Sequence, residues 1–371
     1  MNIGIMTYHS ACNYGAYLQA CALCSWLNEK KDINAEIIDF HMNKEEKYYS
    51  KKSWSFKRRF LHNKEYKFSM DVYKGFERAN YAIGLTKKSS DSCVSDDLDV
   101  FSAFVKNKYD VIIAGSDEIW NTNSFRGFPT PYWLPGDYGV KKVSYAASSR
   151  VDFSRLSDDK AEQIRMFLED FQLLGVRDEL TFKNIKWAVG DNKLQRCCDP
   201  SFLVDLDVTD IYTKYPKSFD SGKKTIVVMT ENNEIANKIK KHCKDRYNLF
   251  SVYHWHSGYE NISNITPEEW LKLICNADLV LASYFHAICF SIMKHTNFLA
   301  LETPSKSSKL LDLLENSVFY KNFISNAVDA DWTFKIEDLL DNPIPNENYD
   351  KFTEFQKEKA ETFLRRLRGI V

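Results

Sequence analysis

The sequence predicts an α/β protein made of two Rossmann-like domains that face each other. Two observations carry this prediction. The chain has 371 residues, which is longer than one hydrophobic core usually serves. Short apolar segments also alternate with segments of helical periodicity in two successive series, the pattern of parallel βαβ units.

The first series predicts an N-terminal domain over residues 1–205. "NIGIMTY" is a short apolar strand, "HSACNYG" a polar turn, and "AYLQACALCSWLNEK" repeats apolar residues at helical spacing before the strand "AEIIDF". Further strands are expected in the segments 109–116, 141–148 and 173–179. Their connections are long enough to keep the strands parallel.

The second series predicts a C-terminal domain over residues 206–345. Its expected elements, in order, are a strand at 224–230, a helix at 231–245, the strand "NLFSVYH", a helix opening at Thr266 and Pro267, the strand "DLVLAS", a helix containing His286 and the strand "NFLALE". Thr266 is a typical N-cap residue and Pro267 suits the first helical turn. The tail 346–371, helical from about Lys351, is expected to pack back across one domain.

An insertion at 41–100, rich in Lys, Arg, Tyr and Phe, interrupts the first series. Helices are expected near 54–64, 70–84 and 96–106. The basic stretch "KKSWSFKRRF" could contact phosphate or an anionic membrane surface, although a solvated helix face is the simpler interpretation.

Composition excludes several classes of function. With 44% hydrophobic and 27% charged residues and a net charge of -1, the chain has no bulk attraction to nucleic acid. No signal peptide or membrane-spanning run is evident, and nine scattered cysteines indicate reduced thiols, so a cytoplasmic protein is expected. Cys21 and Cys24 fit a helix core. His254 and His256 lack a third ligand nearby in sequence, so no metal or cofactor is expected, and the oligomeric state is left open.

Polar residues that follow strands are the first candidates for a site, because ligands of open α/β sheets bind at the carboxyl ends of the strands. Asn13, Tyr14 and Gly15 lie at a helix start that could meet an anion or a sugar hydroxyl, or simply form a capped turn.

The segment "AGSDEIWN" ends another strand. It places Ser116, Asp117, Trp120 and Asn121 together, as a sugar with its hydroxyls and its apolar ring face requires. The simpler interpretation is a helix cap with the tryptophan in the core.

Arg177 and His286 are the candidates for binding an anion and moving a proton. Arg177 ends the strand in "LGVRDE", where a guanidinium could bind phosphate or carboxylate, or pair with Asp178 or Glu179. His286 follows the strand "DLVLAS" at the expected start of a helix. Imidazole there can carry protons, but a lone histidine beside a core helix is more often structural.

Several motifs taken together resemble the polysaccharide pyruvyl transferase family. They are "NYGAYLQACAL", "YKGFERANYAIGLT", "YDVIIAGSDEIWN", "KKVSYAAS", "GVRDE", "DPSFLV" and "NADLVLASYFHAICFSIM", in the family's order over residues 3–300. The resemblance implies a GT-B-like fold with the active site in the cleft between the domains. It also implies transfer of the pyruvyl group of phosphoenolpyruvate to two hydroxyls of a saccharide, as a cyclic ketal, during surface polysaccharide assembly.

The resemblance assigns roles by motif. His286 and Asp117 become the catalytic candidates, and Arg177, His286 and Ser283 the phosphoenolpyruvate-binding residues in the C-terminal half of the cleft. The acceptor, a saccharide or lipid-linked saccharide, is expected on the N-terminal side. Its candidate ligands are Asn13, Tyr14, Ser116, Trp120, Asn121 and Tyr145. Phosphoenolpyruvate serves as substrate, and peripheral contact with the inner face of the cell membrane is an accompanying expectation.

Three positions differ from the family pattern, and two other functions stay open. Tyr284 and Ala287 occupy places in the histidine block where relatives carry other residues, and Glu118 replaces a glutamine in "GSDQIWN". The alternatives are a GT-B-like glycosyltransferase that uses a nucleotide sugar and a saccharide-binding relative without catalysis.

Overall fold

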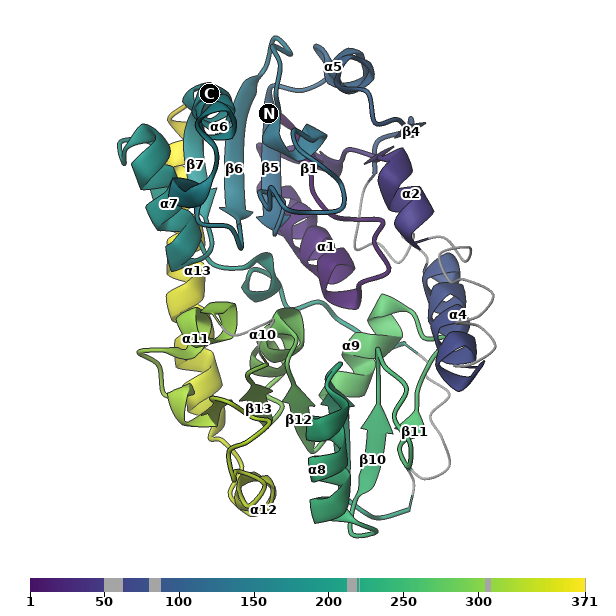
Figure 1. The fold of residues 1–371 in the computed structure, drawn as a ribbon. Coiled ribbons are helices and arrows are strands. Elements are labelled where there is room, and N and C mark those ends of the chain that lie inside the picture. Colours follow the sequence, from purple (N-terminus) through teal and green to yellow (C-terminus); the bar gives the residue numbers. More distant parts are fainter. Residues whose placement is uncertain (50–62, 80–87, 212–218, 220, 304–307, 371) are drawn as a thin grey trace.

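Two parallel sheets, each covered by helices, form the protein in the computed structural model, so the predicted α/β fold with two Rossmann-like domains is confirmed (Figure 1). The structure describes residues 1–49, 63–79, 88–211, 219, 221–303 and 308–370. In that part of the chain both sheets have six strands, and every strand pair is parallel.

The N-terminal sheet has the order β2-β1-β5-β6-β7-β8. Its strands are β1 (Asn2–Met6), β2 (Asn34–Ile37), β5 (Val111–Asp117), β6 (Lys141–Ala147), β7 (Phe171–Val176) and β8 (Leu194–Arg196), and its helices include α1 (Tyr14–Asn28), α6 (Asp158–Glu169) and α7 (Glu179–Val189). β5 is buried almost throughout. A strand that is covered on both faces reads as a continuous apolar run, which explains why "VIIAG" shows no alternation.

The C-terminal sheet has the order β11-β10-β9-β12-β13-β14. Its elements are β9 (Thr225–Met229), α8 (Asn233–Cys243), β10 (Asn248–Ser251), β11 (Glu260–Asn261), α9 (Pro267–Cys275), β12 (Leu279–Ala282), α10 (Phe285–Met293), β13 (Phe298–Leu301), α11 (Ser308–Leu314), β14 (Phe323–Ile324) and α12 (Lys335–Asp341). The predicted cap of α9 is confirmed. The Thr266 hydroxyl accepts from the Glu269 N–H, and the Glu269 carboxylate accepts from the Thr266 N–H.

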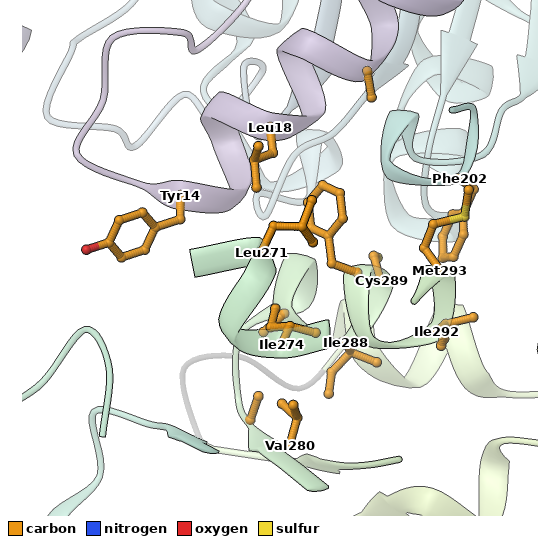
Figure 2. Close-up of a cluster of buried hydrophobic side chains, with 14 of the residues drawn as sticks. Tyr14, Leu18, Phe202, Leu271, Ile274, Val280, Ile288, Cys289, Ile292 and Met293 are labelled. Carbon is orange, nitrogen blue, oxygen red and sulfur yellow. The ribbon is translucent and has the colours of Figure 1, made fainter. Parts of the chain in front are cut away.

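One hydrophobic core joins the two domains. Figure 2 shows Leu18 of α1 close to Leu271 of α9, and Met293 of α10 next to Phe202 of the short helix η4 (Pro200–Phe202). Tyr14 and Ile288 belong to the same cluster of buried residues. Almost every residue of α1 is buried, because the helix lies between its own sheet and the helices of the other domain. The domains are therefore held together by apolar packing near the cleft.

The C-terminal helix α13 (Asn346–Arg368) begins with the predicted segment 346–371, ahead of the helical pattern seen from Lys351, and packs on both domains (Figure 1). Its Phe363 ring lies edge-on to Tyr145 at 4.9 Å, and its Tyr349 ring stacks on His295 at 5.0 Å. The expectation that it packs across one domain is wrong, because its apolar face is long enough to cover both.

The insertion contributes β3 (Phe40–His41), α2 (Asn43–Tyr49), α4 (Asn63–Arg78), β4 (Cys93–Val94) and α5 (Leu98–Val105). The helix expected near 96–106 is confirmed. The helix expected near 70–84 corresponds to α4, which begins earlier, at Asn63. Residues 80–84 of that prediction lie outside the described residues. The same holds for the basic stretch 51–60 and for most of the helix expected near 54–64. Within the described residues, no helix is long and apolar enough to cross a membrane.

Candidate active site

A cavity of about 420 Å³ lies between the carboxyl ends of the two sheets. Its walls come from residues that follow β1, β5 and β7 in one domain and β12 in the other, with α11 and the end of α2 at its edge. Four cationic side chains line it, Arg126, Arg150, Arg177 and Lys309, against the carboxylates of Asp117 and Glu118. Arg126 and Arg177 also pair with Glu45 and Asp199, so the described part of the lining offers several fixed guanidinium and ammonium donors rather than a net positive charge. Such donors suit an anionic ligand.

Arg177 and His286 line this cavity, and both contact the buried carboxylate of Asp199. Arg177 Nη1 donates to Asp199 Oδ2 at 2.6 Å, and His286 Nε2 lies 3.4 Å from the same oxygen. The other carboxylate oxygen of Asp199 accepts from the backbone N–H and the hydroxyl of Ser201. Burial opposes ionisation of Asp199, but His286, Arg177 and Ser201 together hold the pKa of its carboxyl well below the usual range. Asp199 is thus a buried anion that fixes a cation and an imidazole side by side.

The Arg177 guanidinium faces the cavity with donors to spare. Its Nη2 lies 3.7 Å from Asp117 Oδ1, its plane lies over the Phe285 ring at 4.4 Å, and its Nε is buried with no hydrogen-bond partner among the described residues. Burial alone would lower the pKa of Arg177, but Asp199, Asp117 and Asp178 raise it above the ordinary value. A planar, permanently charged donor in this position can bind a carboxylate or phosphate.

Glu118 joins the two domains at the cavity wall. Its carboxylate lies 2.5 Å from Arg150 Nε in its own domain and 2.6 Å from Lys309 Nζ of α11 in the other. Burial would raise the pKa of Glu118, but the two cations lower it to about 2. Burial lowers the pKa of Lys309, and Glu118 opposes that shift. This ion triad holds two cations in place for an anion that enters the cleft.

The insertion supplies the remaining wall. Arg126 pairs with Glu45 of α2, lies over the Tyr8 ring at 3.8 Å, and is 3.5 Å from the Tyr49 hydroxyl. Tyr132 also donates to Glu45, at 2.9 Å. Tyr49 and Arg126 both line the cavity, so α2 shapes it from the N-terminal side.

The structure brings together five of the residues predicted for the site. Asn13, Asp117, Arg177, Ser283 and His286 all line the cavity. Each of them follows a strand of a parallel sheet, which is why their positions in the sequence sufficed to place them at one sheet edge. His286 is the second residue of α10, so the predicted helix start is also confirmed.

Two predicted acceptor residues, Ser116 and Trp120, lie outside this cavity. Trp120 is fully buried, stacks on Trp133 at 5.6 Å and donates its indole N–H to the Tyr132 carbonyl. Ser116 is also fully buried and donates to the Ala146 carbonyl. Assigning them to the acceptor is wrong for this structure, because neither side chain has a surface to offer a sugar. The simpler interpretation of the tryptophan as a core residue holds.

Tyr14, Asn121 and Tyr145 do not line the cavity either. Tyr14 is buried in the core between the domains, stacked on Phe76 at 4.6 Å. The Tyr145 hydroxyl meets Cys198 Sγ at 3.4 Å beneath α13. Asn121 accepts from the Asn123 N–H in the loop beyond the cavity. All three sit close to cavity residues in sequence, but their side chains point into packing or a turn.

Tyr284, which departs from the family pattern, forms an aromatic wall. Its ring stacks on Tyr253 at 4.6 Å, and its hydroxyl is 2.5 Å from His254 Nε2. His256 is turned away, toward Asn233 and the Thr230 carbonyl. His254 and His256 therefore have separate partners.

Sequence reasoning did not assign Asp199, Arg126, Arg150, Lys309 or Tyr49 to the site. Asp199 lies in "CDPSFLV", where an aspartate before proline reads as a helix cap, and it does cap η4 through Ser201. The other four lie in loops or short helices whose sequence carries no signal for the cavity. Only tertiary contact with Glu118, Glu45 or Tyr8 shows their role.

Two parallel-sheet domains with a cavity between their facing edges define a GT-B-like fold. The chain belongs to the polysaccharide pyruvyl transferase family, whose sequence profile matches residues 13–305. This membership supports a pyruvyltransferase of polysaccharide biosynthesis with a saccharide acceptor.

Solved structures with the same fold include nucleotide-sugar enzymes. The chain is similar to UDP-GlcNAc 2-epimerase from Neisseria meningitidis bound to UDP-GlcNAc, with a TM-score of 0.55, 10% identity and 100% of both chains covered. It is also similar to the S. aureus MnaA–UDP structure, with a TM-score of 0.53, 10% identity and coverage of 100% of this chain and 97% of that one. No curated protein sequence matched the chain. At such identities the likeness shows the fold alone.

Proposed function

We propose that this protein transfers the pyruvyl group of phosphoenolpyruvate to two hydroxyls of a saccharide, forming a cyclic ketal and releasing phosphate. The observation that carries the proposal is the placement of Arg177 and His286 around the buried Asp199, in a cavity between the sheets that four cationic side chains line among the described residues. A substrate with both a phosphate and a carboxylate needs several fixed cations, which this cavity supplies.

The donor contacts divide between two groups of cations. Arg177 has N–H groups for the carboxylate end of phosphoenolpyruvate, since its Nε has no hydrogen-bond partner among the described residues and its Nη2 is 3.7 Å from Asp117. Lys309 and Arg150, which both pair with the Glu118 carboxylate, could bind the phosphate. Ser283 adds a hydroxyl to the same wall, although it now bonds to Thr230. Substrate binding would then exchange ion pairs within the protein for pairs with the ligand.

His286 and Asp117 are assigned to the two proton transfers that the reaction needs. Protonated His286, with Asp199 as its counter-ion, gives its proton to the methylene carbon while one sugar hydroxyl bonds to the adjacent carbon and loses its proton to Asp117. The second hydroxyl then bonds to that carbon, the carbon–oxygen bond to phosphate breaks, and the phosphate leaves with the second hydroxyl's proton. Phosphoenolpyruvate and a diol thereby become a pyruvyl ketal and inorganic phosphate.

The acceptor side is the N-terminal wall with Asn13, Tyr49 and Arg126. Beyond Tyr49, the exposed rings of Tyr48 and Phe125 stack face to face at 3.9 Å. Exposed aromatic faces suit the apolar face of a sugar ring, the role that the sequence assigned to Trp120. An acceptor carried on a lipid would place the reaction at the inner face of the cell membrane, as the predicted role in surface polysaccharide assembly requires.

Thermal shifts with phosphoenolpyruvate and with UDP-GlcNAc separate this proposal from a nucleotide-sugar transferase. A ligand that binds only the folded state raises the melting temperature. We expect a concentration-dependent rise with phosphoenolpyruvate. A rise with UDP-GlcNAc and none with phosphoenolpyruvate would overturn the proposal.

The catalytic role of His286 is tested by phosphate release from phosphoenolpyruvate in the presence of cell-envelope saccharides. His286→Asn should reduce the rate by about 100-fold or more, the usual contribution of a proton-transfer group. His295→Asn is the matched control, because His295 pairs with Asp350 on the outer surface. Full activity in His286→Asn would exclude the assigned role. Absence of any turnover by the unmodified protein, despite phosphoenolpyruvate binding, would favour the saccharide-binding alternative.

A further inference from the structure

A group of metal-ligating side chains lies outside the proposed active site, where β1, β2 and β3 come together. His9 follows β1, Asp39 follows β2, and His41 ends β3. One ligand atom from each lies within 4.8 Å of the other two. Asp39 Oδ1 is 2.8 Å from His41 Nε2 and 3.2 Å from His9 Nε2. Ligands of a tetrahedral zinc ion lie about 3.3–3.6 Å apart, so only a small opening of the His41 contact would admit one.

Hydrogen bonding orients His9 as a ligand. Its Nδ1 lies 2.9 Å from the Thr7 carbonyl, which can only accept, so Nδ1 carries the hydrogen. The neutral ring then presents the lone pair of Nε2 to Asp39. A ring nitrogen that donates to a backbone carbonyl while the other faces the metal is the usual outer arrangement of metal-bound histidine.

His41 turns the same ring nitrogen toward Asp39, although its Nδ1 has no hydrogen-bond partner among the described residues. Its Nε2 faces Asp39, and its Nδ1 lies 3.4 Å from the Glu46 carboxylate. In the tautomer of His41 that carries its hydrogen on Nδ1, the Nε2 atom presents a lone pair to Asp39, as Nε2 of His9 does. A cation placed between the two Nε2 atoms and the Asp39 oxygen would satisfy all three lone pairs.

Lys88 shows that this point already attracts positive charge. Its Nζ lies 2.9 Å from the same Asp39 Oδ1. The ammonium group therefore competes for one ligand atom, and a metal ion would displace it. Removing the lysine charge should strengthen metal binding, which a simple ion-pair network would not do.

We propose that His9, Asp39 and His41 form a binding site for a first-row divalent metal ion of the Zn²⁺ type. Two imidazoles and one carboxylate are a donor set that such ions accept, with a fourth position open to water. The site would tie together the ends of β1, β2 and β3. It would thereby support α2, which begins two residues after His41 and delivers Tyr49 to the cavity. This inference does not depend on the proposed reaction.

Zn²⁺ titration of the chelator-treated full chain tests the site, with bound metal measured by elemental analysis and calorimetry. We expect one equivalent of Zn²⁺ in the unmodified protein. His41→Gln should weaken binding by about tenfold or more, and Lys88→Met should tighten it. His242→Gln is the matched control, because His242 also pairs with a carboxylate, Glu337, on a different helix; it should leave binding unchanged.

A second readout uses Co²⁺ in place of Zn²⁺. Bound at this site, Co²⁺ should give a visible absorption spectrum that is lost in His41→Gln and retained in His242→Gln. Lys88→Met is expected to bind the metal ion more tightly. This gain cannot be explained by misfolding, whereas a loss of binding in His41→Gln could be. Failure of both the unmodified protein and Lys88→Met to bind one equivalent would overturn the proposal, as would binding that persists unchanged in His41→Gln.

Discussion

Gly15 lies directly against His286: a Cβ built on Gly15 would be only 2.3 Å from the Cβ of His286. The first turn of α1 in one domain therefore touches the first turn of α10 in the other. Asn13, which lines the cavity, caps α1 by accepting from the Ala16 N–H. The absence of a side chain at position 15 allows the two helix starts, and with them the two sides of the cavity, to approach.

Gly15→Ala should therefore lower both stability and activity. The added methyl must push α1 and α10 apart, and overpacking of this kind costs about 1–3 kcal/mol of unfolding free energy. Displacement of His286 should also slow phosphate release. Urea denaturation and the phosphoenolpyruvate assay measure the two effects. Gly369→Ala is the control, because an added Cβ there meets nothing closer than 3.4 Å.

Replacing Arg177 with lysine should weaken phosphoenolpyruvate binding while keeping the positive charge. A lysine cannot donate to Asp199 and face Asp117 in the geometry of the guanidinium. The loss of a charged hydrogen bond should cost about 2 kcal/mol of unfolding free energy, and the thermal shift with phosphoenolpyruvate should shrink.

The control for that change is Arg196→Lys. Arg196 pairs with Glu179 and Asp312 at a more exposed position. Arg196→Lys should therefore lower the free energy of unfolding by less than about 1 kcal/mol. Equal thermal shifts with phosphoenolpyruvate in Arg177→Lys and in the unmodified protein would contradict the donor assignment.

Glu118 should make stability depend on acid pH. Its pKa falls from 4.5 to about 2 in the folded protein because Lys309 and Arg150 oppose the effect of burial. The carboxylate therefore stabilises the fold fully above pH 4.5, and this contribution is lost as the pH falls toward 2. The unfolding free energy of the unmodified protein should decline across that interval.

Glu118→Gln provides the measurement. At neutral pH it leaves the buried Lys309 without its carboxylate partner, a change that costs about 3 kcal/mol when an ion pair is buried. The difference in unfolding free energy from the unmodified protein should narrow as the pH falls from 4.5 to 2. Glu354→Gln, at an exposed site on α13, should show no such convergence. A difference that stays constant with pH would exclude Glu118 as its source.

Tyr48→Ala should affect the acceptor without affecting the donor. The Tyr48 ring is 54% exposed and stacks on Phe125 beside the cavity residues Tyr49 and Arg126. Loss of an aromatic face should raise KM for cell-envelope saccharides by about tenfold, equivalent to 1.4 kcal/mol. The thermal shift with phosphoenolpyruvate should stay the same. Phe355→Ala removes a comparably exposed ring, on α13, and serves as the control.

Local pattern was sufficient for most of the fold. Thr266 and Pro267 marked the start of α9, and the run "DLVLAS" marked β12, because capping and burial act over a few neighbouring residues. Some boundaries differed from the local pattern: α4 begins at Asn63, whereas the pattern predicted a helix near 70–84. Local pattern could not decide the role of Trp120. A tryptophan at the end of a strand can bind a sugar or pack in the core, and Trp120 is buried.

The sequence by itself determined the alternation of strands and helices and placed Asp117, Arg177 and His286 at strand ends. Parallel strands bring such residues to one edge whatever the details of packing. Only the tertiary structure decided that Asp199 would join Arg177 to His286, and that Lys309 would reach Glu118 from the other domain. Periodicity reports which residues are buried, whereas the partner of a buried charge depends on how distant segments dock.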